Sequence, residues 1–138
     1  MVHGEVIHLE TQGFSDLVDV THEVQQVIDR SGATCGIVNL FIIGSTASIS
    51  TIEFEPALNA DIRAKLEQLV PSNEPSRHSA TWGDDNGFSH MRATLMGPGI
   101  NVPFAEGRLI LGTWQQIVVI DHDNRPRSRQ LHVQVLGE

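Results

Sequence analysis

The chain lacks several features that would assign its class at once. It has a single cysteine, Cys35, so it can form neither an intrachain disulfide nor a cysteine-rich zinc cluster. Its longest apolar run, GIVNLFIIG, is far too short to cross a bilayer. Basic residues are scarce, with 9 Lys and Arg against 17 Asp and Glu, and the formal charge of −8 repels polyanions. We therefore expect a cytoplasmic protein that acts neither on nucleic acid nor in a membrane.

Other absences exclude particular classes of catalytic and phosphate-binding site. There is no glycine-rich phosphate loop and no Ser-His-Asp arrangement that spacing could identify. The basic residues cluster only in NRPRSR, residues 124–129, which we interpret as a charged hairpin. Cys35 lies in an apolar segment, and we expect it to be buried. The 138 residues contain no linker, low-complexity tract or repeat, so we expect one domain, 1–138.

The first half of the chain alternates strand and helix patterns. VHGEVIHLE, residues 2–10, alternates as a strand does, and residues 16–32 predict a helix that stops at Ser31-Gly32. TCGIVNLFIIG, residues 34–44, is typical of a central strand, and residues 47–55 alternate as its neighbour would. Together these two strands suggest a hairpin that turns at Gly44-Ser45.

The second half adds two helices and a β-rich end. Residues 56–71 place Leu58, Ile62, Leu66 and Leu69 on one face, between Pro56 and Pro71. After a loop over 77–91, a short helix is expected from a Ser89 cap to Met96. The last third contains three β-rich segments separated by the turn signals AEG and HDNRP. The predicted fold class is α+β, with an antiparallel β-sandwich-like core and flanking helices.

The loop RHSATWGDDNGFSHM, residues 77–91, contains the candidate chemistry. His78 and His90 bound it, and an imidazole can ligate a metal, donate to a phosphate oxygen or act as a general acid. Gly83 and Gly87 give the loop enough freedom to bring the two side chains together. The alternative is a solvated polar connection whose histidines are surface or capping residues.

Several ordered stretches resemble one family. GPGINVPFAEGRLILGTWQQIVVID is similar to the signature of the YjbQ-like family, also called the secondary thiamine-phosphate synthase family. The resemblance continues in STA at 45–47, LEQLVP at 66–71, WGDDNG at 82–87, SHMRATLMGP at 89–98 and the terminal VQVLGE. It implies a compact α+β fold, a homotrimer and a polar pocket near the subunit boundaries. The implied activity is weak formation of thiamine phosphate from a pyrimidine diphosphate and a thiazole phosphate.

The resemblance also implies site residues and a cofactor. A small phosphorylated molecule would bind, and a divalent metal, zinc or magnesium, would help to neutralise the leaving group. His78 and His90 match two of three family histidines and are the predicted metal ligands. The third opens a motif where this chain has Gly44. Two further departures are Phe88, where the nearest relatives carry histidine, and Ile52-Glu53-Phe54, where an Asn-Glu-Asn run is usual.

The remaining candidates each have a structural alternative. The predicted catalytic residues are His78, His90, Asp61 and Glu53, and the predicted substrate-binding residues are Trp82, Asp84, Asp85, Arg92, Thr113 and Gln115. The two loop aspartates could simply form turns, Asp61 could favour a helix N-terminus, and Glu53 could be an outward strand residue. The structural alternative is packing for Trp82 and Trp114. It is a subunit contact for Gln115. It is pairing with surface acids for Arg92 and Arg108. His3, His8, His22, His122 and His132 are assigned to surface or strand positions.

Two functions from different classes remain open. One is a family enzyme with relaxed activity on phosphate compounds, and the other is a trimeric binding or scaffold protein with a degenerate pocket. Gly44 and Phe88 favour the second, whereas GTWQ, His78, His90 and the acidic loop favour the first. If position 44 faces the two histidines, Gly44→His should restore a third ligand and raise the affinity for zinc.

Overall fold

The chain forms eight antiparallel strands and four helices, in a computed structural model that describes residues 1–138. The strands are β1 (Val2–Thr11), β2 (Asp16–Asp19), β3 (Gly36–Ile43), β4 (Ala47–Ile52), β5 (Gly99–Ala105), β6 (Arg108–Leu109), β7 (Gln116–Asp121) and β8 (Arg127–Gly137). The helices are α1 (Thr21–Ser31), α2 (Pro56–Leu69), α3 (Arg77–Trp82) and α4 (Gly87–Met96). The predicted α+β class with antiparallel sheets is confirmed.

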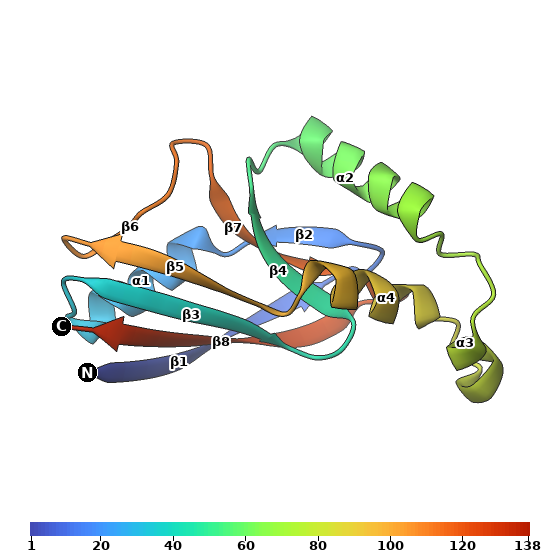
Figure 1. Ribbon diagram of the computed structural model, residues 1–138, viewed down its shortest axis with the longest axis horizontal. Helices are drawn as coiled ribbons and strands as arrows, with labels where there is room; N and C mark the ends of the chain where they lie inside the picture. The colour runs from blue at the N-terminus through green and yellow to red at the C-terminus, as the bar shows by residue number, and fades with distance from the viewer.

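The strands form two sheets (Figure 1). One has five strands in the order β1-β8-β3-β5-β6, and the other has three in the order β2-β7-β4. The prediction of β3 as a central strand is confirmed, because Ile37 pairs with Leu136 on one side and with Pro103 on the other. The chain ends lie together, and the N-terminal amine donates to the Gly137 carbonyl over 2.8 Å.

The core lies between the inner faces of the sheets and α1. Val24, Val27 and Ile28 of α1 are fully buried, as the helical spacing predicts. Burial of each such side chain contributes about 1.5–3 kcal/mol to the stability of the folded state. Gly32 ends the helix in the left-handed conformation, with φ 74°. In Figure 1, α1 lies behind the five-stranded sheet, while α3 lies at the far end of the molecule.

Three sequence-based predictions are wrong. β3 and β4 do not pair as a hairpin at Gly44-Ser45, because β3 belongs to the larger sheet and β4 to the smaller. The NRPRSR segment likewise joins β7 to β8 across the two sheets and is not a hairpin. These two errors have the same cause, since local patterns do not say which sheet a strand joins. The third concerns the predicted helix over 16–32: residues 16–19 form strand β2 along β7, and helix α1 begins only at Thr21.

The segment 77–91 is not a loop. It contains α3, the short connection 83–86 and the first half of α4. Gly83 ends α3 with φ 73°, a value that favours glycine. The second helix begins at Gly87, two residues before the predicted cap, and the Ser89 hydroxyl donates to the Asn86 carbonyl inside the first turn.

Helix α2 is confirmed over 56–69, but it contributes little to the core. Its apolar residues Leu58, Ile62 and Leu66 are only half-buried, and Leu69 is 69% exposed. Figure 1 shows the helix along one border of the molecule. Cys35 is exposed, contrary to expectation, because it precedes β3 at a sheet end. None of the four helices has the length and hydrophobicity needed to span a membrane.

Candidate functional site

His78 and His90 meet. Their imidazole rings have centroids 4.5 Å apart and planes tilted by 47°. The first lies on α3 and the second on α4, so two helices place the rings against each other. The prediction that these side chains come together is confirmed, although helices and a tight connection achieve it instead of a flexible loop.

Local sequence brings the two helices close. Ser76 caps α3 through its hydroxyl, which accepts from the Ser79 amide over 3.0 Å. A Cβ atom at Gly87 would lie 2.1 Å from Ser76 Oγ and 3.6 Å from the Cβ of His78. Only glycine therefore allows the start of α4 to approach α3 so closely. This contact fixes the separation of the two histidines.

Asp84 lies beside His78. Its Oδ1 is 3.3 Å from Nδ1 of His78, a buried atom that has no hydrogen-bond partner within the chain. The carboxylate and the ring are therefore close neighbours without a hydrogen bond between them. Asp84 is itself held, because Asn124 Nδ2 donates to its backbone carbonyl over 2.8 Å.

An apolar groove adjoins His90. Its volume is about 440 Å³, and it is lined by Leu69, Val70, Glu74, His90, Met91, Thr94 and Leu95. The groove runs between the end of α2 and the outer face of α4. Its walls suit a flat heteroaromatic ring, while the imidazole supplies a polar group at one end.

The chain alone does not complete a metal site. No group of three or more His, Cys, Asp or Glu side chains has the geometry to hold a metal ion. Catalytic zinc commonly has three protein ligands and structural zinc has four, whereas the paired rings supply two. Magnesium prefers oxygen ligands. The donor set of this chain therefore does not fit a resident zinc or magnesium ion.

The departures at 44 and 88 have different structural consequences. Phe88 is 3% exposed and stacks on Phe14 with ring centroids 5.9 Å apart. It is a core residue. Gly44 has φ 127°, and a Cβ there would lie 2.4 Å from Nη1 of Arg129. The first atom that a side chain at 44 would meet is thus an arginine nitrogen, and neither histidine lies within 4 Å of that Cβ position.

Arg92 is buried, and all three of its guanidinium nitrogens are already hydrogen-bonded within the chain, so it is not available to bind a phosphate. Its guanidinium donates to the Val70 carbonyl, to Glu67 and to Ser15, and its carbon lies 4.9 Å from the centre of the Phe88 ring. Only 1% of the residue is exposed. These bonds tie the end of α2 to α4, which places the apolar groove.

The other predicted residues divide between two regions. Trp82 and Asp85 are exposed beside the histidine pair, on and after α3. Thr113 and Gln115 lie in the exposed β6–β7 connection, where Gln115 bonds to Thr51 Oγ1 and to the Gly112 amide. Gln115 therefore stabilises the conformation of its own loop. Glu53 and Asp61 are exposed after β4 and on α2, and the structure does not join them to the pair. Trp114 and Arg108 are exposed as well.

The sequence reasoning missed a buried charged cluster. Asp121, His122 and Asp123 are all fully buried, so the surface assignment of His122 is wrong. Arg129 holds Asp121 through Nε and Nη2 at 2.7 and 2.9 Å, and Arg127 holds Asp123 at 2.8 Å. The signal was present in the sequence: an Asp-His-Asp run at the end of an apolar strand, followed by three alternating arginines, of which the second and third reach the cluster.

The cluster shifts three pKa values. Burial alone would raise the pKa of Asp121, but hydrogen bonds from Arg129 and Thr11 outweigh it and lower this pKa. Asp123 behaves in the same way, because the backbone amide of Asn124 and further donors overcome its burial and lower its pKa. Burial lowers the pKa of His122 to about 4, helped by the charge of Arg92. The ring is therefore neutral at pH 7, between the hydroxyls of Ser15 and Ser48 at 2.7 and 2.8 Å.

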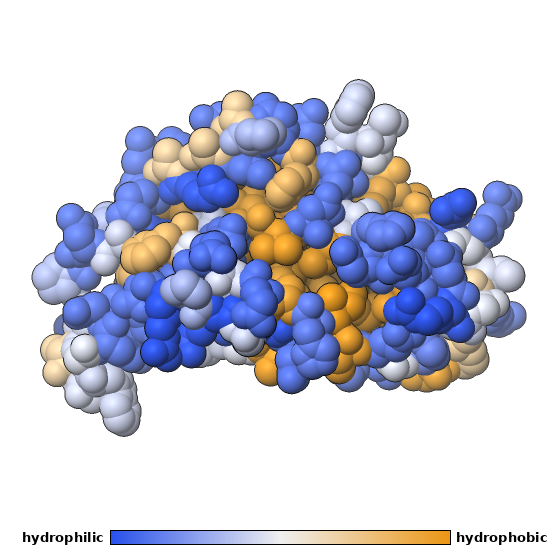
Figure 2. Space-filling view, turned by 180° about the vertical axis from the view of Figure 1, so that it is seen from behind, coloured by the Kyte–Doolittle hydropathy of each residue, from blue (hydrophilic) through white to orange (hydrophobic).

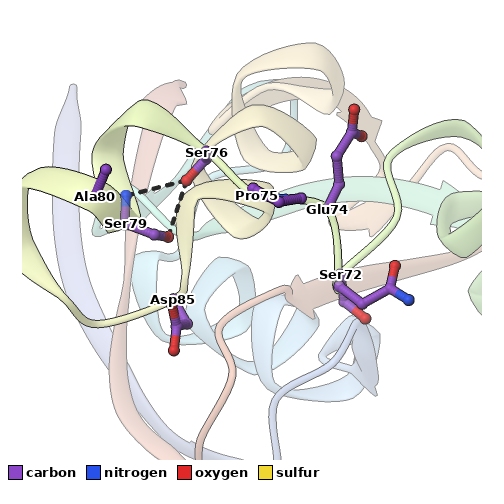
Figure 3. A pocket seen from close by; sticks show the side chains of 8 residues that line it. Ser72, Glu74, Pro75, Ser76, Ser79, Ala80 and Asp85 are labelled. Carbon is purple, nitrogen blue, oxygen red and sulfur yellow. Dashed lines mark hydrogen bonds between the residues drawn. The ribbon is translucent and has the colours of Figure 1, made fainter.

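A second hollow lies on the other side of α3 (Figure 3). It measures about 540 Å³ and is lined by Ser72, Asn73, Glu74, Pro75, Ser76, Ser79, Ala80 and Asp85. Figure 3 shows the Ser76 and Ser79 hydroxyls bonded to each other within it. The lining has two carboxylates and no cationic side chain, so this hollow does not suit an anion.

Comparison with known proteins assigns the family. Residues 5–138 match the family model described as UPF0047 protein YjbQ-like. The chain belongs to this family. A UPF0047 protein of Methanothermobacter thermautotrophicus is 38% identical over 137 residues, which cover 99% of this chain and 94% of the relative. The family predicted from the sequence is thereby confirmed.

Solved structures of YjbQ-like proteins have the same fold. A Sulfolobus solfataricus protein, described as YbjQ-like and of unknown function, superposes with a TM-score of 0.93 at 34% identity, covering 100% of this chain and 99% of that one. A hypothetical protein of Aeropyrum pernix gives 0.91 at 29% identity, with 99% of each chain covered. The two-sheet arrangement and its helices are thus shared by relatives.

Proposed function

We propose that the protein is a cytoplasmic, homotrimeric YjbQ-like protein that binds a small phosphorylated molecule at the His78–His90 pair. The observation that supports this proposal is the contact between two imidazoles, one of which lies beside Asp84, next to an apolar groove. Imidazole N–H groups donate to phosphate oxygen, and the groove accepts an attached ring. A phosphorylated pyrimidine or thiazole has both parts.

The chemistry that this chain can supply is proton transfer. His78 and His90 lie close enough to act on the same ligand, and an imidazole nitrogen can take a proton from a bound group or donate one to it. The implied reaction, which joins a pyrimidine diphosphate to a thiazole phosphate, also needs charge neutralised on the departing pyrophosphate. Only the imidazoles supply that here, because Arg92 is fully engaged. We therefore propose weak thiamine-phosphate synthase activity at most.

Binding without turnover is the second candidate function. A buried Phe88 and a side-chain-free position 44 replace two polar groups that the family resemblance implies. The pair would bind a divalent metal only weakly through its two nitrogens. In this version the protein is a trimeric small-molecule-binding or scaffold protein whose pocket has lost its catalytic groups.

The trimer is supported by an uncovered sheet face. Outward residues of β1, β3 and β8 leave six apolar side chains at least 39% exposed: Val2, Val6, Ile37, Phe41, Ile43 and Leu136. The outward residues of β3 from 37 to 43 and of β8 from 130 to 136 include no charged group, in a chain of net charge −8. Copies of the chain can approach through such a face with little repulsion. Figure 2 shows the opposite side of the molecule, where a separate apolar area lies across the middle.

The test is an assay of thiamine-phosphate formation by the purified protein. We expect a rate well below that of a relative with all three histidines, and a further loss in His90→Ala. The exposed residue His22 on α1 provides a matched control, and His22→Ala should leave the rate unchanged. A rate equal to that of the relative and abolished by His90→Ala would refute a degenerate pocket. No activity together with intact ligand binding would favour the second function.

A further inference from the structure

The buried cluster at the end of β7 has a carboxylate that is fixed from two neighbouring strands. Asp123 is fully buried. Its Oδ2 accepts hydrogen bonds from Thr46 Oγ1 over 3.0 Å and from Arg127 Nε over 2.9 Å. Thr46 precedes β4 and Arg127 begins β8, so the carboxylate is held from both sheets. A charged group that is held in this way can fix the position of other groups that bond to it.

The same end of β7 also contacts the connection between α3 and α4, residues 83–86. Asp123 Oδ1 accepts from the backbone amide of Asn124 over 2.8 Å and from Asn86 Nδ2 over 3.3 Å. Asn124 Nδ2 donates to the backbone carbonyl of Asp84 over 2.8 Å. The connection is therefore tied to β7 at both Asp84 and Asn86.

The Asn86 amide lies between two carboxylates. The residue is only 6% exposed, and in one orientation its nitrogen donates to Asp123. In the opposite orientation the nitrogen lies 3.1 Å from Asp84 Oδ1. Either orientation gives the buried amide a charged acceptor, and a buried amide without one would be costly. Asn86 is therefore strongly restrained.

The two restrained positions adjoin the two histidines. Asp84 Oδ1 lies 3.3 Å from Nδ1 of His78. Asn86 immediately precedes α4, the helix that carries His90, and its carbonyl accepts from the Ser89 hydroxyl in the first turn. A shift of the connection would therefore move the start of α4 relative to α3 and separate the two rings.

We propose that Asp123 and Asn124 are positioning residues for the His78–His90 pair. They fix the connection 83–86 and so determine where the two rings lie relative to each other. The proposal rests on the function proposed for the pair, because the separation of the rings has a consequence only when both act on one ligand. Neither positioning residue supplies a group to the ligand, so loss of either changes the geometry of the site and not its chemical groups.

Asp121 provides a matched comparison for Asp123. Both carboxylates are fully buried, and each is paired with an arginine. Asp121 accepts from Arg129 and from the backbone amide of Asp123. None of its hydrogen bonds reaches residues 83–86. An Asp→Asn change at either position removes a buried negative charge, but only the change at 123 alters the bonds to the connection.

The test compares Asp123→Asn with Asp121→Asn in the full chain, under conditions in which both are folded. We expect the NMR contact between the two imidazole signals to be lost in Asp123→Asn and kept in Asp121→Asn. The affinity for a thiazole phosphate, measured by calorimetric titration, should fall by about 10-fold or more in Asp123→Asn, as is typical when a supporting residue is lost. It should be unchanged in Asp121→Asn. A purely structural role would lower the stability of both variants and leave the ring contact intact in both.

Asn124→Asp decides the matter if Asp123→Asn does not fold. The change keeps the shape of this half-buried side chain but removes the donor to the Asp84 carbonyl. Ala64→Glu, which adds the same charge at an exposed position on α2, is its control. We expect the ring contact to weaken in Asn124→Asp only. An unchanged ring contact in Asn124→Asp and in folded Asp123→Asn would overturn the proposal.

The ring contact also separates this proposal from the proposed function. If the native chain binds no thiazole phosphate, the function proposed for the pair fails. The NMR comparison of the variants does not use the ligand, so it still shows whether Asp123 and Asn124 position the rings.

Discussion

The rings of His78 and His90 lie with their centroids 4.5 Å apart, and the contact between Gly87 and Ser76 allows this approach. The two histidines belong to different helices, so their separation depends on how closely α4 begins against α3. The connection 83–86 is short, and Asp84 within it touches His78. The geometry of the site is thus set by packing of helices.

Gly87→Ala should disrupt the pair. The new methyl group would lie 2.1 Å from Ser76 Oγ, so the helices must separate or the cap must break. We expect destabilisation of about 1–3 kcal/mol in urea unfolding and loss of the contact between the two imidazole signals in NMR spectra. Gly97→Ala is the comparison, because a Cβ there meets nothing within 4 Å and only its φ of 93° is strained. Preserved contact in Gly87→Ala would show that this glycine does not control the pair.

Gly44→His should not create a zinc site. The sequence-based hypothesis placed position 44 opposite the two histidines, but its Cβ would instead meet Arg129, and the φ of 127° is unfavourable for histidine. We expect a stability loss of about 1–3 kcal/mol and no gain in zinc affinity by calorimetric titration. A clear gain that disappears in the double variant with His90→Ala would contradict the structure.

Stability should fall as pH falls through the range set by His122. Its pKa is lowered to about 4 from the ordinary value of 6.5, so the folded state favours the neutral ring. This contribution is complete above pH 6.5 and is lost between about pH 6.5 and 4, because the unfolded chain takes up the proton first. The total is on the order of 3 kcal/mol. Asp121 and Asp123, with lowered pKa values, add a further loss at still lower pH.

Urea unfolding of the native chain and of His122→Gln at several pH values measures the contribution of His122 to stability. Glutamine stays neutral and can still bond to a serine hydroxyl. We expect the variant to be less stable at pH 7 but to lose less stability than the native chain on acidification to pH 4.5. Parallel curves for the two proteins would mean that His122 does not account for the acid sensitivity.

Phe41→Glu should dissociate the proposed trimer. The side chain is 46% exposed on the uncharged face of the central strand, where a carboxylate from each copy would be desolvated on association. Sedimentation equilibrium should give the mass of three chains of 15.2 kDa for the native protein and a lower mass for the variant. Ala64→Glu on α2 should leave the mass unchanged. A native protein that stays monomeric at all concentrations would exclude the trimer.

Periodicity predicted much of the fold because the buried residues repeat at regular spacing. Val24, Val27 and Ile28 identified α1, and the apolar run of 36–43 identified the central strand. The pairing of strands could not be predicted in the same way. β3 and β4 are adjacent in sequence, yet each pairs with strands from the last third of the chain.

The candidate site could be predicted only in part from the sequence. The two histidines could be chosen from seven because they bound one polar segment and match family histidines, but Arg92 could not be distinguished from a phosphate ligand without its buried partners. The burial of His122 was also hidden, because its stabilising hydroxyls on Ser15 and Ser48 are far away in the chain.

The central claim is that the His78–His90 pair binds a small phosphorylated molecule. Calorimetric titration with a thiazole phosphate tests it most directly, using the native chain, His90→Ala and the exposed control His22→Ala. We predict saturable binding to the native chain and to the control, and affinity lower by about 10-fold or more in His90→Ala, since a hydrogen bond to a charged group contributes about 1.5–3 kcal/mol. Equal affinity in all three proteins, or no binding to the native chain, would contradict the assignment of this site.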